Sequence, residues 1–167
     1  MNRLYKNLVN LLLQKVRLYN EFIDLLRKEW DAVAGYSLEN FNDIMNKKET
    51  LIVKSQVLEE NRNRVMEAFA KGLGLPAGDF TLSKLISARQ DPCNPKLAEC
   101  RRRLLKQIET IRELNEKNKL LINHSSLSLK KSMAFIHRCD EESRSSYYSN
   151  GRLQEARMQS RLLNTDA

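Results

Sequence analysis

Five side chains of this 167-residue chain could bind a metal ion or act as nucleophiles: Cys93, Cys100, Cys139, His124 and His137. Structural zinc sites draw their Cys and His ligands from closely spaced pairs. The spacing of these five residues matches no such pattern, so we expect neither a metal site nor a cofactor. We expect Cys100 to pack inside a helix bundle and the other two cysteines to be incidental, with all three thiols reduced in the cytosol.

The sequence contains no other motif that indicates catalysis. It has no glycine-rich phosphate loop and no Ser/His/Asp or Cys/His arrangement tied to a strand scaffold. His124 lies in the polar segment 123–126, which we expect to form an exposed face of a helix. The sequence therefore predicts a protein that is not an enzyme and has no small-molecule substrate.

The net charge of +8 is concentrated in one segment of the chain. Residues 96–131 hold ten Lys and Arg against four Asp and Glu, and Arg101, Arg102 and Arg103 form the densest run. Such a segment can bind nucleic acid or acidic lipid, or it can be the solvated face of a helix. No aromatic or glycine-rich recognition pattern accompanies the charge, which favours the solvated face. We therefore expect no nucleic-acid partner.

A long first helix is indicated by nine large apolar residues whose spacing alternates between four and three residues. This is the 3.5-residue repeat of a helix that packs lengthwise against other helices. It predicts a helix over residues 2–34, with Gly35 as the C′ residue that follows it. The nine residues of this seam are Tyr5, Val9, Leu12, Val16, Tyr19, Ile23, Leu26, Trp30 and Val33.

A second helix is predicted over residues 38–71, with Ser37 as its N-cap. Three seam positions of this helix are polar: Lys48, Ser55 and Arg62. Polar seam residues can fix the register between helices, or long basic side chains can extend from the flank of a bundle with their charged ends in water. We favour the second interpretation. The apolar inner face comprises Phe41, Ile44, Met45, Leu51, Ile52, Leu58, Val65, Met66 and Phe69.

Four helix-breaking residues, Gly72, Gly74, Pro76 and Gly78, predict a loop after the second helix. A short helix over residues 81–87 follows, with an apolar face of Leu82, Leu85 and Ile86. A second break at residues 91–95 ends in Pro95, which suits the first turn of a helix. A third long helix is then predicted over residues 96–136.

The third long helix changes character along its length. Its first half has an apolar seam of Leu97, Cys100, Leu104, Ile108 and Ile111, whereas its second half places Asn115, Asn118 and Ser125 at seam positions. A helix that matches its bundle partners over half its length usually has another partner. The weak pattern of residues 137–167 predicts a mobile or helical C-terminal tail. The predicted fold is all-α: an elongated antiparallel three-helix coiled-coil bundle over residues 1–136, with a short extra helix in the second connection.

Three motifs follow one another along the chain. Residues 46–51 (NKKETL) are followed by Leu58 and Arg62, residues 114–121 read LNEKNKLL, and residues 147–151 read YYSNG. In this order and spacing they resemble the second helix, the L-N-x-x-N-x-L-L signature and the late Y-x-x-x-G of the FlgN family of flagellar export chaperones. The similarity covers about residues 7–151, although Lys119 stands where the family often has Gly.

The resemblance implies a cytoplasmic type III export chaperone. Such proteins bind hook–filament junction (hook-associated) proteins through the C-terminal segments of these clients, prevent their premature assembly and deliver them to the flagellar export gate. The resemblance implies that Tyr147, four residues before Gly151, docks on the gate, with Tyr148 as the alternative. The implied client-binding residues are Leu114, Asn115, Asn118, Leu121, Ile122 and Leu129.

The periodicity alone would also suit a coiled-coil adaptor or structural protein unrelated to flagella. The apolar seam can be buried within one chain or between two, so a monomer and a homodimer both fit. The Leu11–Leu13 cluster is too short for a signal peptide or a membrane span, which favours a cytoplasmic protein.

Overall fold

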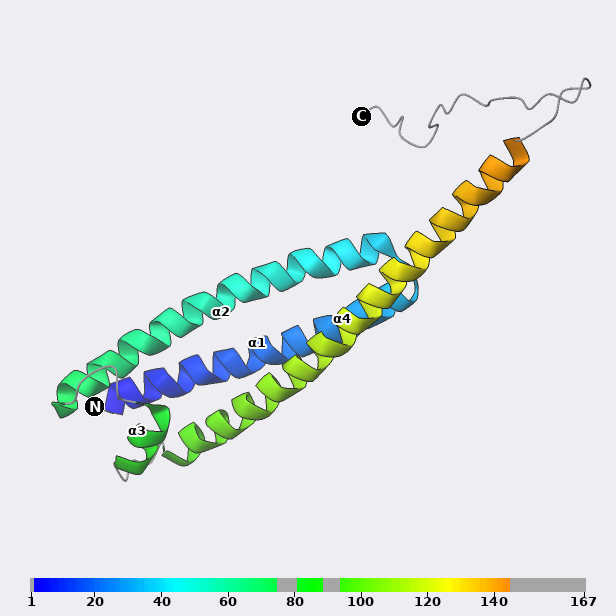
Figure 1. Cartoon of the computed structure of the whole chain (residues 1–167). Helices are drawn as coiled ribbons and strands as arrows, with labels where there is room; N and C mark the ends of the chain where they lie inside the picture. The colour runs from blue at the N-terminus through cyan, green and yellow to red at the C-terminus, as the bar shows by residue number, and fades with distance from the viewer. Residues whose placement is uncertain (1, 75–80, 89–93, 145–167) are drawn as a thin grey trace, which may run out of the picture. The chain divides into compact units, whose positions relative to one another are not determined.

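The computed structural model describes residues 2–74, 81–88 and 94–144 (Figure 1). The regular secondary structure of these residues is α-helical, which confirms the predicted all-α class. The chain divides into two units, Met1–Ile122 and Asn123–Ala167, and each is described by itself. The helices are α1 (Asn2–Ala34), α2 (Leu38–Leu73), α3 (Leu82–Ala88) and α4 (Asn94–Arg144).

The helix bounds differ most from the sequence prediction at the end of α4. Helix α1 has the predicted bounds, and α2 ends two residues later than predicted. Helix α4 continues eight residues beyond the predicted end at 136. The apolar pattern fades there, but residues 137–144 contain no Gly or Pro to break the helix. The pattern therefore marked the end of the apolar face and not the end of the helix.

The turn between α1 and α2 corrects the role given to Gly35. Its N–H still donates to the carbonyl of Asp31 at 2.9 Å, and the left-handed conformation falls instead on Tyr36, with φ of 53°. Because the N–H of Ser37 donates to the carbonyl of Ala32 at 2.9 Å, the turn has the form of a Schellman motif with Tyr36 at C′. Ser37 is the N-cap of α2 as predicted, although its side chain makes no capping hydrogen bond.

Helix α2 runs antiparallel to α1 within the first unit. Lys15 of α1 pairs with Glu59, late in α2, whereas Glu29, further along α1, pairs with Lys48, early in α2. Helix α1 lies between α2 and the part of α4 that belongs to this unit (Figure 1). Two neighbours therefore cover different sides of α1.

A hydrophobic core at one end of the first unit brings all four helices together. Phe69 of α2 meets Tyr5 of α1 edge-on, with ring centroids 4.8 Å apart. Leu85 places the short helix α3 against this core, and Cys100 packs inside it as predicted. The core residues are Tyr5, Leu8, Val9, Leu12, Val16, Val65, Met66, Phe69, Ala70, Leu85, Leu97, Cys100 and Leu104.

The seam predicted for α1 is wrong at Trp30. Its side chain is 42% exposed, whereas the neighbouring Glu29 is 3% exposed. A helix with two neighbours buries a wider face than a single seam, and Leu8, Leu18 and Ala32 are buried for the same reason. Ile52 of α2, predicted on the inner face, is exposed as well.

Candidate functional site

The predicted client-binding residues of α4 differ in how accessible they are. In the first unit, Asn118 is 3% exposed and Asn115 is exposed. Leu114, Leu121 and Ile122 are half-buried there. In the second unit, Leu129 is 61% exposed. A partner can therefore touch most of this set directly, while Asn118 belongs to the interior of the first unit.

A buried polar cluster joins α1, α2 and α4 at Glu29. Lys48 of α2 donates from Nζ to both carboxylate oxygens of Glu29 at 2.9 Å. Asn118 of α4 donates from Nδ2 to Glu29 at 2.7 Å and to the carbonyl of Leu26 at 2.7 Å. The Lys48 side chain is 12% exposed, so the expectation that its charged end extends into water is wrong. The buried carboxylate supplies the partner that a charged group needs away from water.

A second buried amide, Gln107 of α4, also connects this helix to α1. Its Nε2 donates to the carbonyl of Val16 at 2.9 Å and to Oδ1 of Asn20 at 2.6 Å. Because Gln107 lies at Val16 and Asn118 lies further along α1, α4 runs parallel to α1 in this unit. Sliding α4 by a turn would leave these buried N–H groups unpaired, at a cost of about 1–3 kcal/mol each. The two amides therefore fix the register of α4 on α1.

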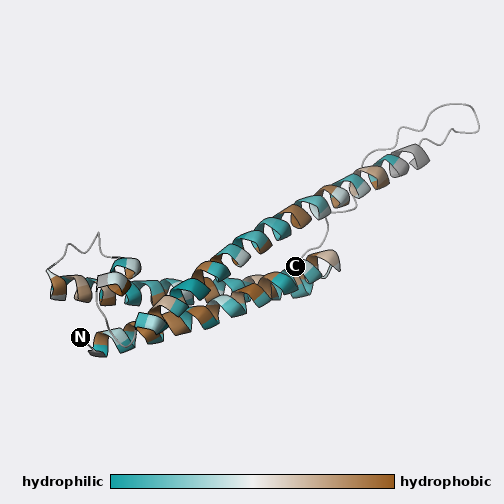
Figure 2. Cartoon of the chain, turned by 90° about the horizontal axis from the view of Figure 1, so that it is seen from below, coloured by the Kyte–Doolittle hydropathy of each residue, from teal (hydrophilic) through white to brown (hydrophobic). Residues whose placement is uncertain are grey.

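In the second unit, α4 carries a stripe of exposed apolar residues. Leu129, Met133 and Ile136 are 61%, 50% and 61% exposed, and their spacing of four and three residues places them on one face. Apolar positions recur along this part of the helix (Figure 2). We call these three residues the α4 stripe. An exposed apolar stripe at helical spacing is typical of a helix that binds another amphipathic helix.

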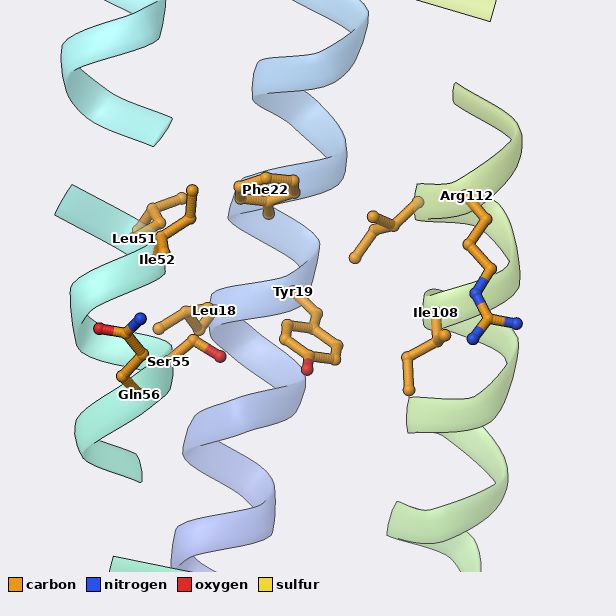
Figure 3. Close-up of a pocket in the computed structure, with 10 residues that line it drawn as sticks. Leu18, Tyr19, Phe22, Leu51, Ile52, Ser55, Gln56, Ile108 and Arg112 are labelled. Carbon is orange, nitrogen blue, oxygen red and sulfur yellow. The ribbon is translucent and has the colours of Figure 1, made fainter. Parts of the chain in front are cut away.

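The first unit has an apolar groove on the side of α1 that carries Tyr19 and Phe22. Figure 3 shows α1 as the floor of this groove, with α2 and α4 on either side. Its volume is about 350 Å³. Residues that line it include Tyr19, Phe22, Ile52, Ile108, Ile111 and Arg112. The sequence prediction did not identify this groove.

Ion pairs between α1 and α2 stand at the two ends of the groove. Lys15 pairs with Glu59, and its Nζ lies 5.7 Å from the centroid of the Tyr19 ring. Burial alone would raise the pKa of Glu59, but hydrogen bonds from Lys15 and Arg62 lower this pKa overall. The carboxylate is therefore charged at neutral pH, and the pair persists there.

The predicted export-gate residues, Tyr147, Tyr148 and Gly151, lie outside the described residues. Within the described part of the chain, no group of three or more His, Cys, Asp or Glu is placed to hold a metal ion. Burial raises the pKa of the Cys100 thiol, which keeps it protonated. Among the described helices, none combines the length and the apolar character of a membrane span.

Sequence reasoning missed Glu29 and Gln107. A signal for Glu29 was present, since Lys48 and Asn118 both occupy seam positions of their helices. Two polar side chains directed into a bundle require a polar partner, and a carboxylate satisfies both. No comparable signal marks Gln107, which stands next to the seam residue Ile108.

No curated protein and no solved structure matches this chain. The family described as FlgN protein matches residues 1–155, which include all of α1 to α4. The matched region also contains the LNEKNKLL motif of α4, which supplies Asn118 to the buried cluster. The chain therefore belongs to the FlgN family of flagellar export chaperones.

Proposed function

We propose that this protein is a cytoplasmic chaperone of the flagellar type III export system. Its clients are hook–filament junction proteins, which it binds through their C-terminal segments, keeps unassembled and delivers to the export gate. Membership of the FlgN family supports the flagellar role. The observation that carries the client-binding part is the α4 stripe, because its three side chains are at least half exposed.

A chaperone of this kind needs a surface that complements a client before assembly. A terminal segment that becomes helical only in the assembled filament is disordered and amphipathic beforehand. An exposed apolar stripe on a helix gives such a segment a template for folding on binding. Part of the binding energy is spent on ordering the client, which keeps the affinity moderate and allows release at the gate.

The client-binding residues in the first unit have two roles in this proposal. Asn115, Leu121 and Ile122 contact the client, and half-buried Leu114 supports them. Asn118 acts indirectly, because its hydrogen bonds to α1 hold α4 in place. We further propose that α1, α2 and α4 form the antiparallel three-helix bundle predicted from the sequence, with monomer and homodimer both compatible.

Leu129→Asp is expected to weaken binding of a junction protein by about tenfold or more, since it places a charge on the α4 stripe. Leu127→Asp is the matched control, because Leu127 is 51% exposed and lies roughly 160° around the same helix. Isothermal titration calorimetry with full-length junction proteins, and with versions lacking the C-terminal segment, measures both effects. Equal losses in the two variants would argue against the stripe.

The same experiment distinguishes the chaperone from the alternative function, a non-flagellar coiled-coil adaptor. The chaperone proposal requires that the unmodified chain bind a junction protein and that removal of the client's C-terminal segment abolish binding. A chain that binds no junction protein would support the adaptor, because the heptad pattern serves either role.

Tyr147→Ala is expected to lower affinity for the export gate by about tenfold or more while leaving client affinity unchanged. A tyrosine suits a transient contact, since it combines apolar area with a polar hydroxyl. Binding to the purified cytoplasmic part of the gate, together with motility on soft agar, measures the effect. Tyr148→Ala is the neighbouring control; a loss confined to that variant would move the docking role to Tyr148.

A further inference from the structure

The groove on α1 has the shape and surface of a binding site for a helix. Tyr19 and Phe22 form its floor, Ile52 lies on the α2 side, and Ile108 lies on the α4 side (Figure 3). Ile52 is 46% exposed although it is a large apolar residue. Two helices flanking a third leave room for a fourth helix to complete a bundle, with its apolar side chains directed at the floor.

The ends of the groove limit the length of its occupant. The Lys15–Glu59 pair stands beside Tyr19, and the Lys48–Glu29 pair stands beside Phe22, where Lys48 Nζ lies 5.9 Å from the ring centroid. Lys15 and Glu29 are about 14 residues apart on α1, which corresponds to about 20 Å of helix. Between these ion pairs, the α1 residues that line the groove are Leu18, Tyr19 and Phe22, so its open part contacts about two turns of an occupying helix.

The charge around the groove selects the chemistry of that helix. Of the described residues that line the groove, Arg112 alone is charged. It forms no ion pair with the described part of the chain. It belongs to the part of α4 in the first unit, where residues 96–122 carry eight basic residues against four acidic ones. An acidic side chain at the edge of an incoming helix would pair with Arg112 and be attracted by this field.

We propose that the groove binds a second segment of the client, an acidic amphipathic helix. Its apolar side chains pack on Phe22 and Ile108, and a Glu or Asp beside them pairs with Arg112. The identity of the client rests on the proposed function. The groove and its preference for an acidic helix are argued from the first unit alone. Two contacts of moderate affinity on one client give a higher overall affinity, and each contact can dissociate separately when the client is released.

The test compares variants inside the groove with matched variants beside it. Ile52→Asp and Arg112→Glu are each expected to lower the affinity for a full-length junction protein by about tenfold or more. Val53→Asp and Lys106→Glu are the controls, since Val53 and Lys106 are exposed on the same two helices, do not line the groove and lie outside the proposed client-binding residues. Titration calorimetry in low and high salt gives affinity and its salt dependence, which Arg112→Glu is expected to reduce.

Two results would overturn the groove assignment and leave the chaperone proposal intact, and a third would overturn the chaperone proposal. If the unmodified chain binds and the groove variants bind as the controls do, the groove is not a client site. If Ile52→Asp changes only self-association in analytical ultracentrifugation, the groove binds a second copy of the chain. If the unmodified chain binds no junction protein, the proposed function itself fails. Circular dichroism monitors folding, and should Ile52→Asp unfold, the exposed Arg112→Glu decides.

Discussion

Lys48→Met is expected to destabilise the protein by about 3–5 kcal/mol, because it leaves the carboxylate of Glu29 buried without its ion-pair partner. Asn118 still donates one hydrogen bond to that carboxylate, but a neutral amide does not balance its charge. Urea unfolding followed by circular dichroism at 222 nm measures the change. The loss is a large part of the 5–15 kcal/mol that is typical of a folded protein.

Two further variants identify the cause of this loss. Lys47→Met removes the same positive charge from the neighbouring exposed position of α2 and is expected to change stability by less than about 0.5 kcal/mol. The double variant Glu29→Met, Lys48→Met removes both charges and is expected to recover most of the stability. A double variant as unstable as Lys48→Met alone would mean that packing around Lys48, and not the unpaired carboxylate, accounts for the effect.

The same cluster connects stability with the proposed client-binding residues of α4. Asn118 contacts both Glu29 and the backbone of α1, so it holds α4 at a fixed position. The amide oxygens of Asn118 and Gln107 have no hydrogen-bond partner among the described residues. Polar layers of this kind specify register but add less stability than Leu or Ile would. At Gln107 and Asn118 the attachment of α4 to α1 is therefore specific without being strongly apolar, whereas the core supplies the apolar contacts.

The sequence predicted the helices well because their signals are local. A heptad pattern and the positions of Gly and Pro define where each helix starts and stops with little reference to the rest of the chain. The exception at Gly35 shows the limit of that approach. A glycine near a helix end favours the left-handed conformation, but here Tyr36, one residue later, adopts that conformation.

The sequence signalled the buried cluster only through the polar seam positions of Lys48 and Asn118, and it did not signal the groove, because both features depend on three helices at once. Glu29, Lys48 and Asn118 come together only when the registers of α1, α2 and α4 are known. A pattern within one helix predicts that a glutamate next to Trp30 faces water, and the structure reverses the two residues. The groove likewise includes Phe22, which stands outside the single seam assigned to α1.

Phe69→Ala is the second substitution with a large expected effect, a loss of about 3–5 kcal/mol. Phe69 is 1% exposed in the core that joins α1, α2, α3 and α4. Removing its ring leaves a cavity and also ends the edge-on contact with Tyr5. For a chain of this length, the melting temperature is expected to fall by about 10 °C.

Phe135→Ala provides the matched control, because it removes the same atoms from a helical position that is 67% exposed. We expect this variant to melt within about 2 °C of the unmodified protein, since its ring is already largely in water. Thermal unfolding at 222 nm compares the two variants directly. A similar fall in melting temperature in both variants would place Phe135 in a buried contact. A small fall in Phe69→Ala would mean that the four-helix core does not account for the stability of the first unit. Because Phe69 is distant from the α4 stripe in sequence, client affinity measured well below the melting temperature should change little in Phe69→Ala, which separates stability from binding.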